Sequence, residues 1–332
     1  MAASSDLLAD PGVLPPGPGL EIGDWQAVAR QGGLALLHWR RHALAAEAAG
    51  VNYQSSAEAA PGPWPWAAVA AEGNRAATLA AVAQAACALQ PGGLLLLHGG
   101  NDQGIRGSVR AVTRAWGWPG EALVQRAHAR VHAFRMAQPP AATAPATDYW
   151  QSPGGLRLRA DPGVFPGPRL DRGSAVLLQA LAILADELPP PQRLLDLGCG
   201  GGVLALEAAR LWPQAQLDLA DGDARAIACA AANLQAQGRR GQLHWWDSAE
   251  VPPVRDVDLV LCNPPWHVDG AVDRSPGLAM CRAAGQALAP GGQALVVATR
   301  TQPFEPSLAP FGALREIVQD DGFKVLALRR AA

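Results

Sequence analysis

The stretch that decides the fold reads Arg193-Leu194-Leu195-Asp196-Leu197-Gly198-Cys199-Gly200-Gly201-Gly202. Its first half is apolar and predicts a buried strand, its glycines predict a tight turn, and residues 203–211 behind them predict a helix. A strand, a glycine-rich turn and a helix form a nucleotide cradle. Glycines let the backbone approach a ligand closely, and the helix N-terminus offers free N–H groups.

The spacing of the glycines does not by itself identify the nucleotide. Gly198 and Gly200 fail the dinucleotide pattern G-x-G-x-x-G/A, whereas Gly200 and Gly202 satisfy it. Asp196 at the strand end decides between the two ligand classes, because a carboxylate there repels a pyrophosphate and suits an ammonium group. S-adenosylmethionine carries an ammonium and a sulfonium, so we predict this cofactor.

Acidic residues follow the next two predicted strands as well. Asp221 follows strand 216–220, where an acid binds ribose hydroxyls, and Asp247 follows strand 243–246, where a side chain could accept from an adenine amino group. Either carboxylate could instead cap the next helix or turn. Three successive strand ends with an Asp favour the ligand interpretation. The predicted cofactor-binding residues are Asp196, Gly198, Cys199, Gly200, Asp221, Asp247 and Asn263.

A fourth predicted strand, 257–262, ends at Asn263-Pro264-Pro265-Trp266. Neither proline can donate to a sheet ladder, so the strand stops there in a stiff turn. The Asn263 side-chain oxygen and the Pro264 carbonyl could hold the two hydrogens of an exocyclic amine and turn its lone pair toward an electrophile. Trp266 could stack on the ring, which is worth about 1–3 kcal/mol. We therefore predict Asn263, Pro264, Pro265 and Trp266 as catalytic residues acting by positioning and fixed dipoles.

The remaining chain predicts an α/β protein of two domains. We expect a disordered, Pro- and Gly-rich segment 1–20, a domain 21–136, a linker 137–150 and a catalytic domain 151–332. In the first domain we expect a loop over 61–66, helices over 74–89 and 107–116 and a strand over 94–98, and no strand ends in an acidic, glycine-rich loop. In the second, 311–323 is predicted as a helix or turn. The segment 88–96 matches 287–295 in pattern, which indicates duplication.

Composition excludes several classes of protein. The 332 residues carry a formal net charge of -2 with 17% charged residues, which argues against a strong non-specific grip on nucleic acid. The five cysteines are scattered without a CxxC pair, so no metal site or disulfide framework is predicted. A signal peptide and an apolar stretch long enough to cross a membrane are both missing, and we expect a cytoplasmic protein.

Taken in order, the Asp196 loop, Asp221, Asp247 and the Asn263 turn resemble a class I S-adenosylmethionine-dependent methyltransferase. More narrowly, 162–165 and 170–174 resemble the ribosomal small-subunit RNA guanine-N2 methyltransferases, which carry a degenerate N-terminal copy of the catalytic domain. Residues 64–66 and 104–107 occupy matching places in that copy. The resemblance implies two tandem Rossmann-like domains, a mostly parallel seven-stranded sheet in the second, and methyl transfer to N2 of a guanosine in ribosomal RNA or a ribosomal subunit.

Two departures from the family pattern and two alternatives remain. The family turn usually carries Phe where this chain has Trp266, and the family stretch Phe-Ser-Arg-Asp-Gly-Leu-Asp is here Phe165-Pro-Gly-Pro-Arg-Leu-Asp171. The same turn would serve a protein glutamine amide or an adenine amine. A non-catalytic RNA-binding or ribosome-assembly factor with the same fold is the alternative from another class.

Overall fold

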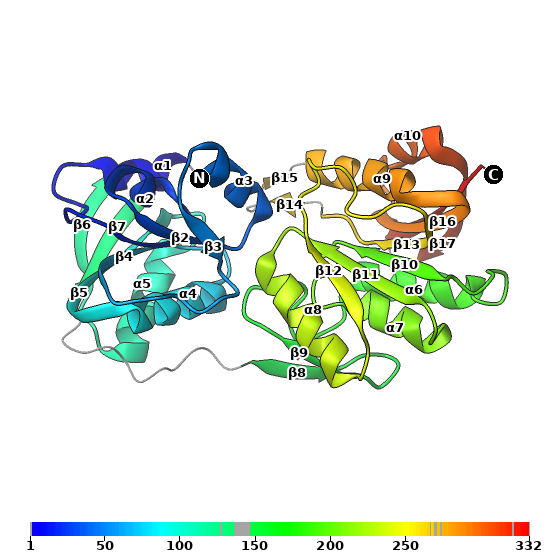
Figure 1. The fold of residues 1–332 in the computed structure, drawn as a ribbon, viewed down its shortest axis with the longest axis horizontal. Coiled ribbons are helices and arrows are strands. Elements are labelled where there is room, and N and C mark those ends of the chain that lie inside the picture. The colour runs from blue at the N-terminus through cyan, green and yellow to red at the C-terminus, as the bar shows by residue number, and fades with distance from the viewer. Residues whose placement is uncertain are drawn as a thin grey trace. The chain divides into compact units, whose positions relative to one another are not determined.

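A computed structural model describes residues 2–126, 128–135, 147–265, 267–268, 271–272, 274–320 and 322–331. The chain divides into two compact units, Met1–Ala146 and Thr147–Ala332, which we call the N-terminal and C-terminal units (Figure 1). The division falls inside the predicted linker 137–150. Residues 136–146 lie outside the described residues, so the linker stays a prediction there, whereas 148–151 form a strand.

The N-terminal unit contains a seven-stranded sheet in the order β3-β2-β1-β4-β5-β7-β6. Its first five strands run parallel, and β7 pairs antiparallel with both β5 and β6. The strands are β1 Gly19–Ile22, β2 Gly33–Leu37, β3 Tyr53–Ser55, β4 Trp64–Ala70, β5 Leu89–Gly100, β6 Glu121–Arg126 and β7 Ala129–Arg135. The helices are α1 Ala2–Ser5, η1 Asp6–Ala9, α2 Gln26–Gln31, α3 Arg40–Ala48, α4 Arg75–Cys87 and α5 Ile105–Trp116.

The C-terminal unit repeats this sheet with the order β12-β11-β10-β13-β16-β18-β17. Its strands are β10 Arg193–Leu197, β11 Gln216–Asp221, β12 Gly241–Trp245, β13 Val257–Cys262, β16 Leu288–Thr299, β17 Gly312–Asp320 and β18 Phe323–Arg330. Two short pairs, β8 Asp148–Gln151 with β9 Arg157–Ala160 and β14 His267–Val268 with β15 Ala271–Val272, stand apart from it. The helices are α6 Arg172–Leu184, α7 Val203–Leu211, α8 Ala224–Ala236, α9 Ser275–Ala287, α10 Glu305–Leu308 and η2 Ala309–Phe311.

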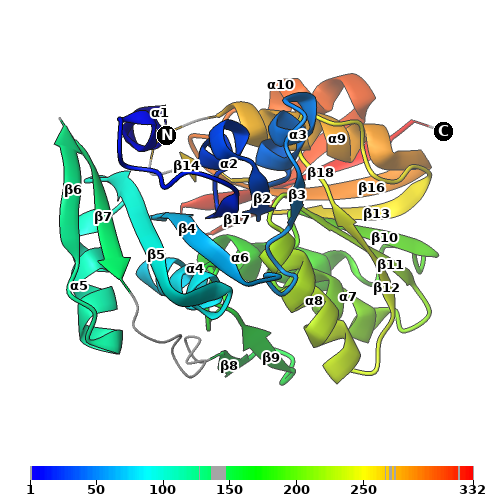
Figure 2. The ribbon, with the colours of Figure 1, turned by 60° about the vertical axis from the view of Figure 1, so that its left-hand side comes forward.

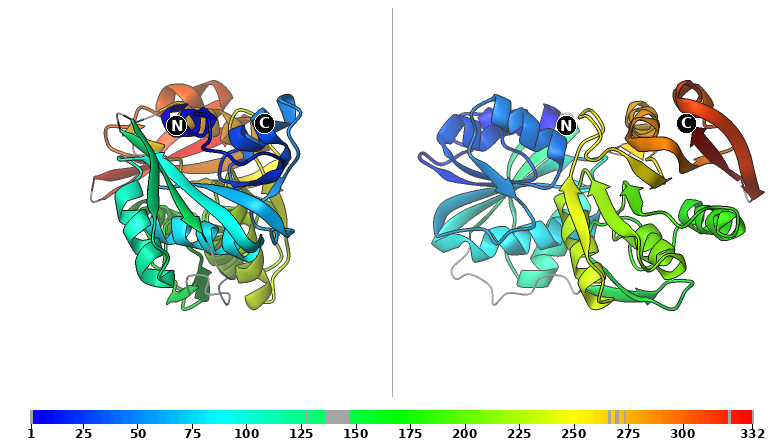
Figure 3. Two further views of the ribbon diagram at one scale, coloured as in Figure 1. Left: turned by 90° about the vertical axis from the view of Figure 1, so that its left-hand side faces the viewer. Right: turned by 45° about the vertical axis from the view of Figure 1, so that its right-hand side comes forward.

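The two sheets have the same connectivity, strand for strand, which confirms the predicted tandem Rossmann-like fold. The matching segments noted in the sequence fall on equivalent strands, β5 and β16, and each strand pairs with its parallel neighbour across a register irregularity. Gly92 and Gly291 in these strands share a φ of +76°. Helices cover both faces of each sheet (Figures 2 and 3).

Packing follows the same plan in both units. In the C-terminal unit α6, α7 and α8 cover one apolar face of the sheet, and α9 and α10 cover the other. In the N-terminal unit α4 and α5 cover one face, while α2 packs on the opposite face with η1, which supplies Leu7 and Leu8. Open α/β sheets bind ligands at the carboxyl ends of their parallel strands, so these ends are where a site is expected.

Three predictions of local structure were wrong. Residues 2–9 form α1 and η1 instead of a disordered segment, because Leu7 and Leu8 are buried against the sheet. The predicted loop 61–66 ends early, since β4 begins at Trp64. The predicted helix or turn over 311–323 is the edge strand β17, whose half-exposed residues lack a continuous apolar pattern.

Candidate active site

The glycine loop follows β10 and leads into α7 as predicted. Asp196 is fully buried, and its Oδ2 accepts the N–H of Ala205, the third residue of α7, at 3.0 Å. Its Oδ1 is buried and has no hydrogen-bond partner among the described residues. Burial raises the pKa of Asp196 to about 7, and the nearby charge of Asp221 adds to the increase. An unpartnered buried acceptor of this kind is stabilised by a cationic donor.

The backbone N–H groups of this loop are already bonded within the protein. Gly198 and Cys199 both donate to the carbonyl of Ala220, at 2.8 and 3.0 Å, and Gly200 donates to Oδ2 of Asp221 at 2.8 Å. A pyrophosphate needs free N–H donors, and these three do not supply them. Carboxylate oxygens dominate the loop instead, so the site suits a cation and hydroxyl groups better than an anion.

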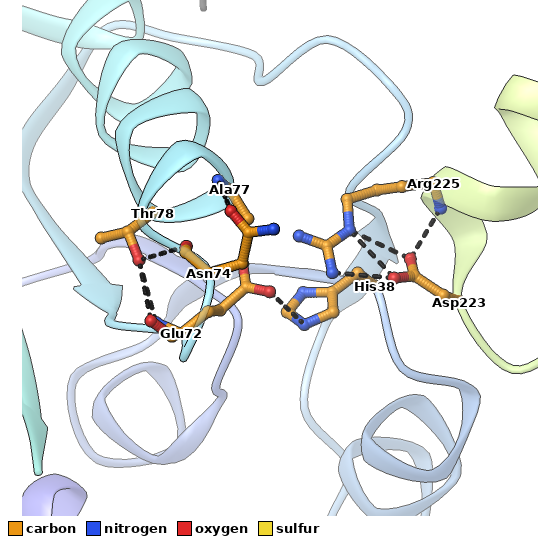
Figure 4. A network of polar contacts seen from close by, with 7 residues as sticks. All are labelled: His38, Glu72, Asn74, Ala77, Thr78, Asp223 and Arg225. Atoms are coloured by element: carbon orange, nitrogen blue, oxygen red, sulfur yellow. Dashed lines mark hydrogen bonds and ion pairs between the residues drawn. The ribbon is translucent and has the colours of Figure 1, made fainter. Parts of the chain in front are cut away.

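Asp221 lies at the end of β11, as the sequence indicates, and is half-buried. Its two oxygens accept the N–H groups of Gly200 and Asp223, each at 2.8 Å. Each oxygen keeps a second lone pair, so capping and hydroxyl binding are compatible. Burial raises the pKa of Asp221 to about 6. Asp223, the N-cap of α8, is held by Arg225 at 2.8 Å and so has a structural partner of its own (Figure 4).

Asp247 lies two residues beyond the end of β12. Its Oδ1 accepts the N–H of Ala249 at 2.9 Å, and its own N–H donates to Glu250 at 3.0 Å. The carboxylate therefore closes a turn, which is the alternative that the sequence left open for it. Its contact with an adenine group stays a prediction.

Two glycines of the loop make room for neighbouring segments. Gly198 has φ +79°, and a Cβ there would lie 2.6 Å from the methyl carbon of Met280 on α9. A Cβ on Gly200, with φ +51°, would lie 2.6 Å from the carbonyl oxygen of Phe165. The segment around Phe165 therefore lies directly against the loop, and its ring is 63% exposed. The sequence placed Phe165 in a family motif without assigning it to the site.

Asn263 is the first residue after β13 and lies beside this loop. Its Nδ2 donates to Oδ1 of Asp171 and to Oγ of Ser174, each at 3.1 Å. Asp171 is the N-cap of α6, and the same Oδ1 accepts the N–H of Ser174 at 3.0 Å. Because Asp171 Oδ1 and Ser174 Oγ both accept from this nitrogen, they fix which end of the Asn263 amide is bonded to α6. The amide oxygen is left for another donor.

The rest of the predicted catalytic turn is only partly described. Pro264 is buried and Pro265 is exposed, which fits a strand that leaves the core abruptly. The carbonyl oxygen of Pro265 passes close to α9, where a Cβ on Gly277 would lie 2.8 Å from it. Trp266 lies outside the described residues, so its stacking role stays a prediction.

Asn233 on α8 is a structural residue of the site that the sequence did not single out. Its side chain donates to the carbonyls of Gly201, at 2.9 Å, and Arg159, at 3.1 Å, and accepts the N–H of Arg159 at 2.7 Å. It is fully buried and joins the glycine loop to β9. An Asn inside an Ala-rich helix, facing the core, is the sequence signal that could have identified it.

Comparison with known proteins decides the family. The Methyltransferase small domain family matches residues 155–327, slightly more than half of the chain. A Pseudomonas aeruginosa protein named ribosomal RNA small subunit methyltransferase C is 33% identical over 247 residues, covering 73% of this chain and 72% of its own. This chain belongs to the ribosomal RNA small subunit methyltransferase C family.

Further members of this family agree in sequence and fold. A Pseudomonas paraeruginosa protein of the same name is 34% identical over 246 residues, covering 72% of each chain. The solved structure described as T. thermophilus 16S rRNA N2 G1207 methyltransferase (RsmC) in complex with AdoMet and guanosine has a TM-score of 0.84, with 25% identity, and covers 98% of this chain and 91% of that one.

As a member of this family, the chain shows which features its N-terminal copy kept. Glu21 in β1 is equivalent to Asp196: it is fully buried, its Oε2 accepts the N–H of Val28, the third residue of α2, at 3.0 Å, and its Oε1 has no partner among the described residues. No strand of this unit was expected to end in an acidic, glycine-rich loop; β1, a four-residue strand too short to recognise, carries the acid, followed by the single glycine Gly23. Burial raises the pKa of Glu21 to about 8.

The N-terminal copy has lost the other two acceptors of the site. By strand register, Glu21 pairs with Ala35 and Ala68 where Asp196 pairs with Leu219 and Leu261. Counting two residues onward, Leu37 stands at the position of Asp221, and Ala70 at that of Asn263. His38 follows Leu37 and lies 3.7 Å from Glu72 (Figure 4), and its ring would lie 3.4 Å from a Cβ on Gly23. The His38 ring therefore occupies space beside Gly23, the first residue after β1.

Neither a metal centre nor a membrane span is found in the described part of the chain. No group of three or more His, Cys, Asp or Glu side chains there could hold a metal ion. No described helix is long and apolar enough to cross a bilayer. All five cysteines are free thiols.

Proposed function

We propose that this protein transfers the methyl group of S-adenosylmethionine to the exocyclic N2 amine of a guanosine in small-subunit ribosomal RNA, with the site on the C-terminal unit. Family membership supports the reaction class and the RNA. The observation that carries the site is the fixed orientation of the Asn263 amide, whose nitrogen donates to Asp171 and Ser174 and whose oxygen has no hydrogen-bond partner among the described residues. A cytoplasmic location, where ribosomes are found, fits this proposal.

The residues present fit S-adenosylmethionine. The buried Oδ1 of Asp196 would accept from the ammonium group, whose charge relieves the cost of ionising a buried carboxylate. Asp221 would accept from ribose hydroxyls through its remaining lone pairs, and Asp247 is the predicted neighbour of the adenine ring. Gly198, Cys199 and Gly200 would form the wall of the cradle rather than its donors. When bound, the cofactor supplies an electrophilic methyl group on a sulfonium.

The chain's own residues would prepare the nucleophile. An exocyclic amine on guanine is weakly nucleophilic because its lone pair is delocalised into the ring. The Asn263 amide oxygen would accept one amine hydrogen and the Pro264 carbonyl the other, which turns the lone pair out of conjugation. The product amine is cationic and loses its proton readily, so no strong base is needed. Catalysis then rests on positioning and on preorganised dipoles.

Aromatic rings would hold the flipped guanine. Extruding a base from its stack costs a few kcal/mol, and base–aromatic stacking returns about 1–3 kcal/mol per ring. Trp266 is the predicted stacking residue. Phe165 is a second candidate, because it is exposed and its backbone touches the glycine loop.

Relatives favour guanosine over the other planar groups that the turn could accept. The T. thermophilus relative was solved with guanosine and AdoMet together. A glutamine amide or an adenine amine has no comparable support. The non-catalytic alternative is disfavoured because the buried acid, the second acid and the amide are all in place.

The test is methyl transfer to RNA with the site of the label identified. Purified protein is incubated with methyl-labelled S-adenosylmethionine and small-subunit rRNA or subunits from a strain that lacks the gene. The RNA is then digested to nucleosides and separated by mass spectrometry. N2-methylguanosine is the expected product, and label in N6-methyladenosine or in ribosomal protein would overturn the substrate assignment.

A further inference from the structure

The N-terminal unit carries a row of exposed arginines on α5. Arg106, Arg110 and Arg114 follow one another at intervals of four residues, and all three are exposed. Residues four apart on a helix lie on the same side, one turn after the other. We call Arg106, Arg110 and Arg114 the arginine row.

The row faces away from the sheet. Ile105, Ser108 and Val112 are the buried residues of α5, and the first and last of these belong to the core beneath α4 and α5. At 100° per residue they mark the inner side of the helix, and the arginine row lies across the outer side. The helix is therefore packed on one side and positively charged on the other.

No carboxylate neutralises the row. None of its three guanidinium groups has a hydrogen bond or ion pair with a residue that the structure describes. α5 and the neighbouring α4 contain no Asp or Glu, and Arg75 of α4 adds a fourth cation, because its Nη2 would lie 2.9 Å from a Cβ on Gly107. In a chain of net charge -2, this concentration of unpaired positive charge is a local feature.

The row works against the stability of its own helix. Like charges four residues apart repel each other, and the helix dipole disfavours Arg106 in the first turn, although it favours Arg114 in the last. The catalytic copy has no such row. Its equivalent helix between the same two strands is the short α10, whose Glu305 is paired with Lys324. An unfavourable charge arrangement that occurs in only one copy indicates a binding partner whose negative charge offsets the repulsion.

We propose that the arginine row binds the phosphate backbone of the RNA substrate. Guanidinium groups present planar donors that match phosphate oxygens, and successive helical turns are spaced on the scale of adjacent phosphates along a strand. Such contacts position an RNA without reading its sequence. The inference rests on the proposed function for the identity of the RNA, and it gives the N-terminal copy, which lacks the methyl-transfer residues, a role in substrate binding.

The test measures RNA binding by the full chain as a function of salt. The probe is an unmodified small-subunit rRNA transcript, and the variant is R106Q/R110Q/R114Q. Losing three phosphate contacts should weaken binding about tenfold or more and reduce the slope of log K against log salt by about 2 to 3. The charge-preserving variant R106K/R110K/R114K should keep most of the slope.

The matched control removes the same charge elsewhere. Arg240 and Arg255 shortly precede β12 and β13, and Arg329 lies in β18; all three are exposed and lie toward the end of the sheet opposite Asn263. R240Q/R255Q/R329Q should bind RNA as the wild type does. If this control loses as much RNA affinity as R106Q/R110Q/R114Q, the loss comes from the change in net charge and not from the arginine row, and the proposal is overturned. All six residues are exposed, so both triple variants should fold; the thermal midpoint of the control should stay unchanged, and that of R106Q/R110Q/R114Q should be equal to or above that of the wild type.

Two further outcomes separate this inference from its foundation. Unchanged RNA binding by R106Q/R110Q/R114Q, or a loss seen only with assembled subunits, would refute RNA contact by the row; the second result would assign it to a ribosomal protein. Absence of N2-methylguanosine with the wild type would defeat the proposed reaction. The salt titration would still test RNA binding by the arginine row, because binding needs no methyl transfer.

Discussion

The amide nitrogen of Asn263 lies 3.1 Å from a carboxylate oxygen of Asp171, a residue 92 positions earlier in the chain. This contact joins the end of β13 to the start of α6, and it decides that the nitrogen of the amide is the end bonded to Asp171, so the amide oxygen keeps no hydrogen-bond partner among the described residues. If Asn263 has the proposed catalytic role, Asp171 acts through it and is a positioning residue rather than a catalytic one.

Asp171→Ala should lower kcat for RNA methylation about 10- to 100-fold, because the Asn263 amide can then rotate. The affinity for S-adenosylmethionine should change little, since Asp171 is not among its predicted ligands. Loss of the N-cap should also cost about 1 kcal/mol of stability, so Asp171→Asn, which still caps, should lose less. Asp186→Ala, at the exposed far end of α6, is the control. A rise in KM with unchanged kcat would contradict the positioning role.

Asn263→Ala should reduce methyl transfer by about 100-fold or more, the usual effect of removing one preorganised polar contact in an active site. Calorimetry should show cofactor binding largely retained. If Asp171 acts only through Asn263, the double variant Asp171→Ala/Asn263→Ala should be no slower than Asn263→Ala alone. Additive losses would show that Asp171 has a separate function.

Cofactor affinity should fall as the pH drops below about 7. Asp196 has a pKa raised to about 7 by burial, and only its ionised form attracts an ammonium group. Protonation therefore competes with binding, and the Kd for the cofactor should rise by up to about tenfold for each pH unit below this pKa. Asp221, with a pKa raised to about 6, adds to the loss of affinity at lower pH. Titrations between about pH 5.5 and 7.5, below the ordinary pKa of an α-amino group, test this. Asp196→Asn should bind more weakly with a flatter profile; an unchanged slope would exclude Asp196.

Glu21 should make the protein less stable as the pH rises. Its pKa is raised to about 8 in the folded protein, mainly by burial, from an ordinary value of 4.5. The folded state therefore holds a proton that the unfolded state has released, and the stabilisation present below about pH 4.5 is lost as the pH rises through about 8, by up to a few kcal/mol. Glu21→Gln keeps an acceptor for the N–H of Val28 but cannot titrate. The free energy of unfolding of this variant, measured with denaturant, should therefore change less with pH over this range. If the free energy of unfolding of the variant falls with pH as steeply as that of the wild type, the pH dependence belongs to other groups.

The sequence predicted the catalytic unit well because its signals are local. The strand 257–262 and the helix 203–211 have the predicted bounds, and Asp196, Asp221 and Asn263 stand at strand ends. The failures have a common physical origin. β17 is an edge strand with few buried residues, and β1 has only four residues. The bonds of Asn263 to Asp171 and of Asn233 to Gly201 join distant segments, which no local pattern reveals.

Glu21 and Asp196 hold the same position in two copies of one sheet, yet only one copy has Asp221 and Asn263 beside it. The first acid is thus common to both copies of the sheet, whereas the other two acceptors are present in one copy only. A genome survey that scores an acid followed by glycine would count both halves of such chains as active. Under the proposed function, Leu37 and Ala70 are the positions that distinguish the N-terminal half from the C-terminal one, and any attempt to engineer methyl transfer into the N-terminal half has to begin with them.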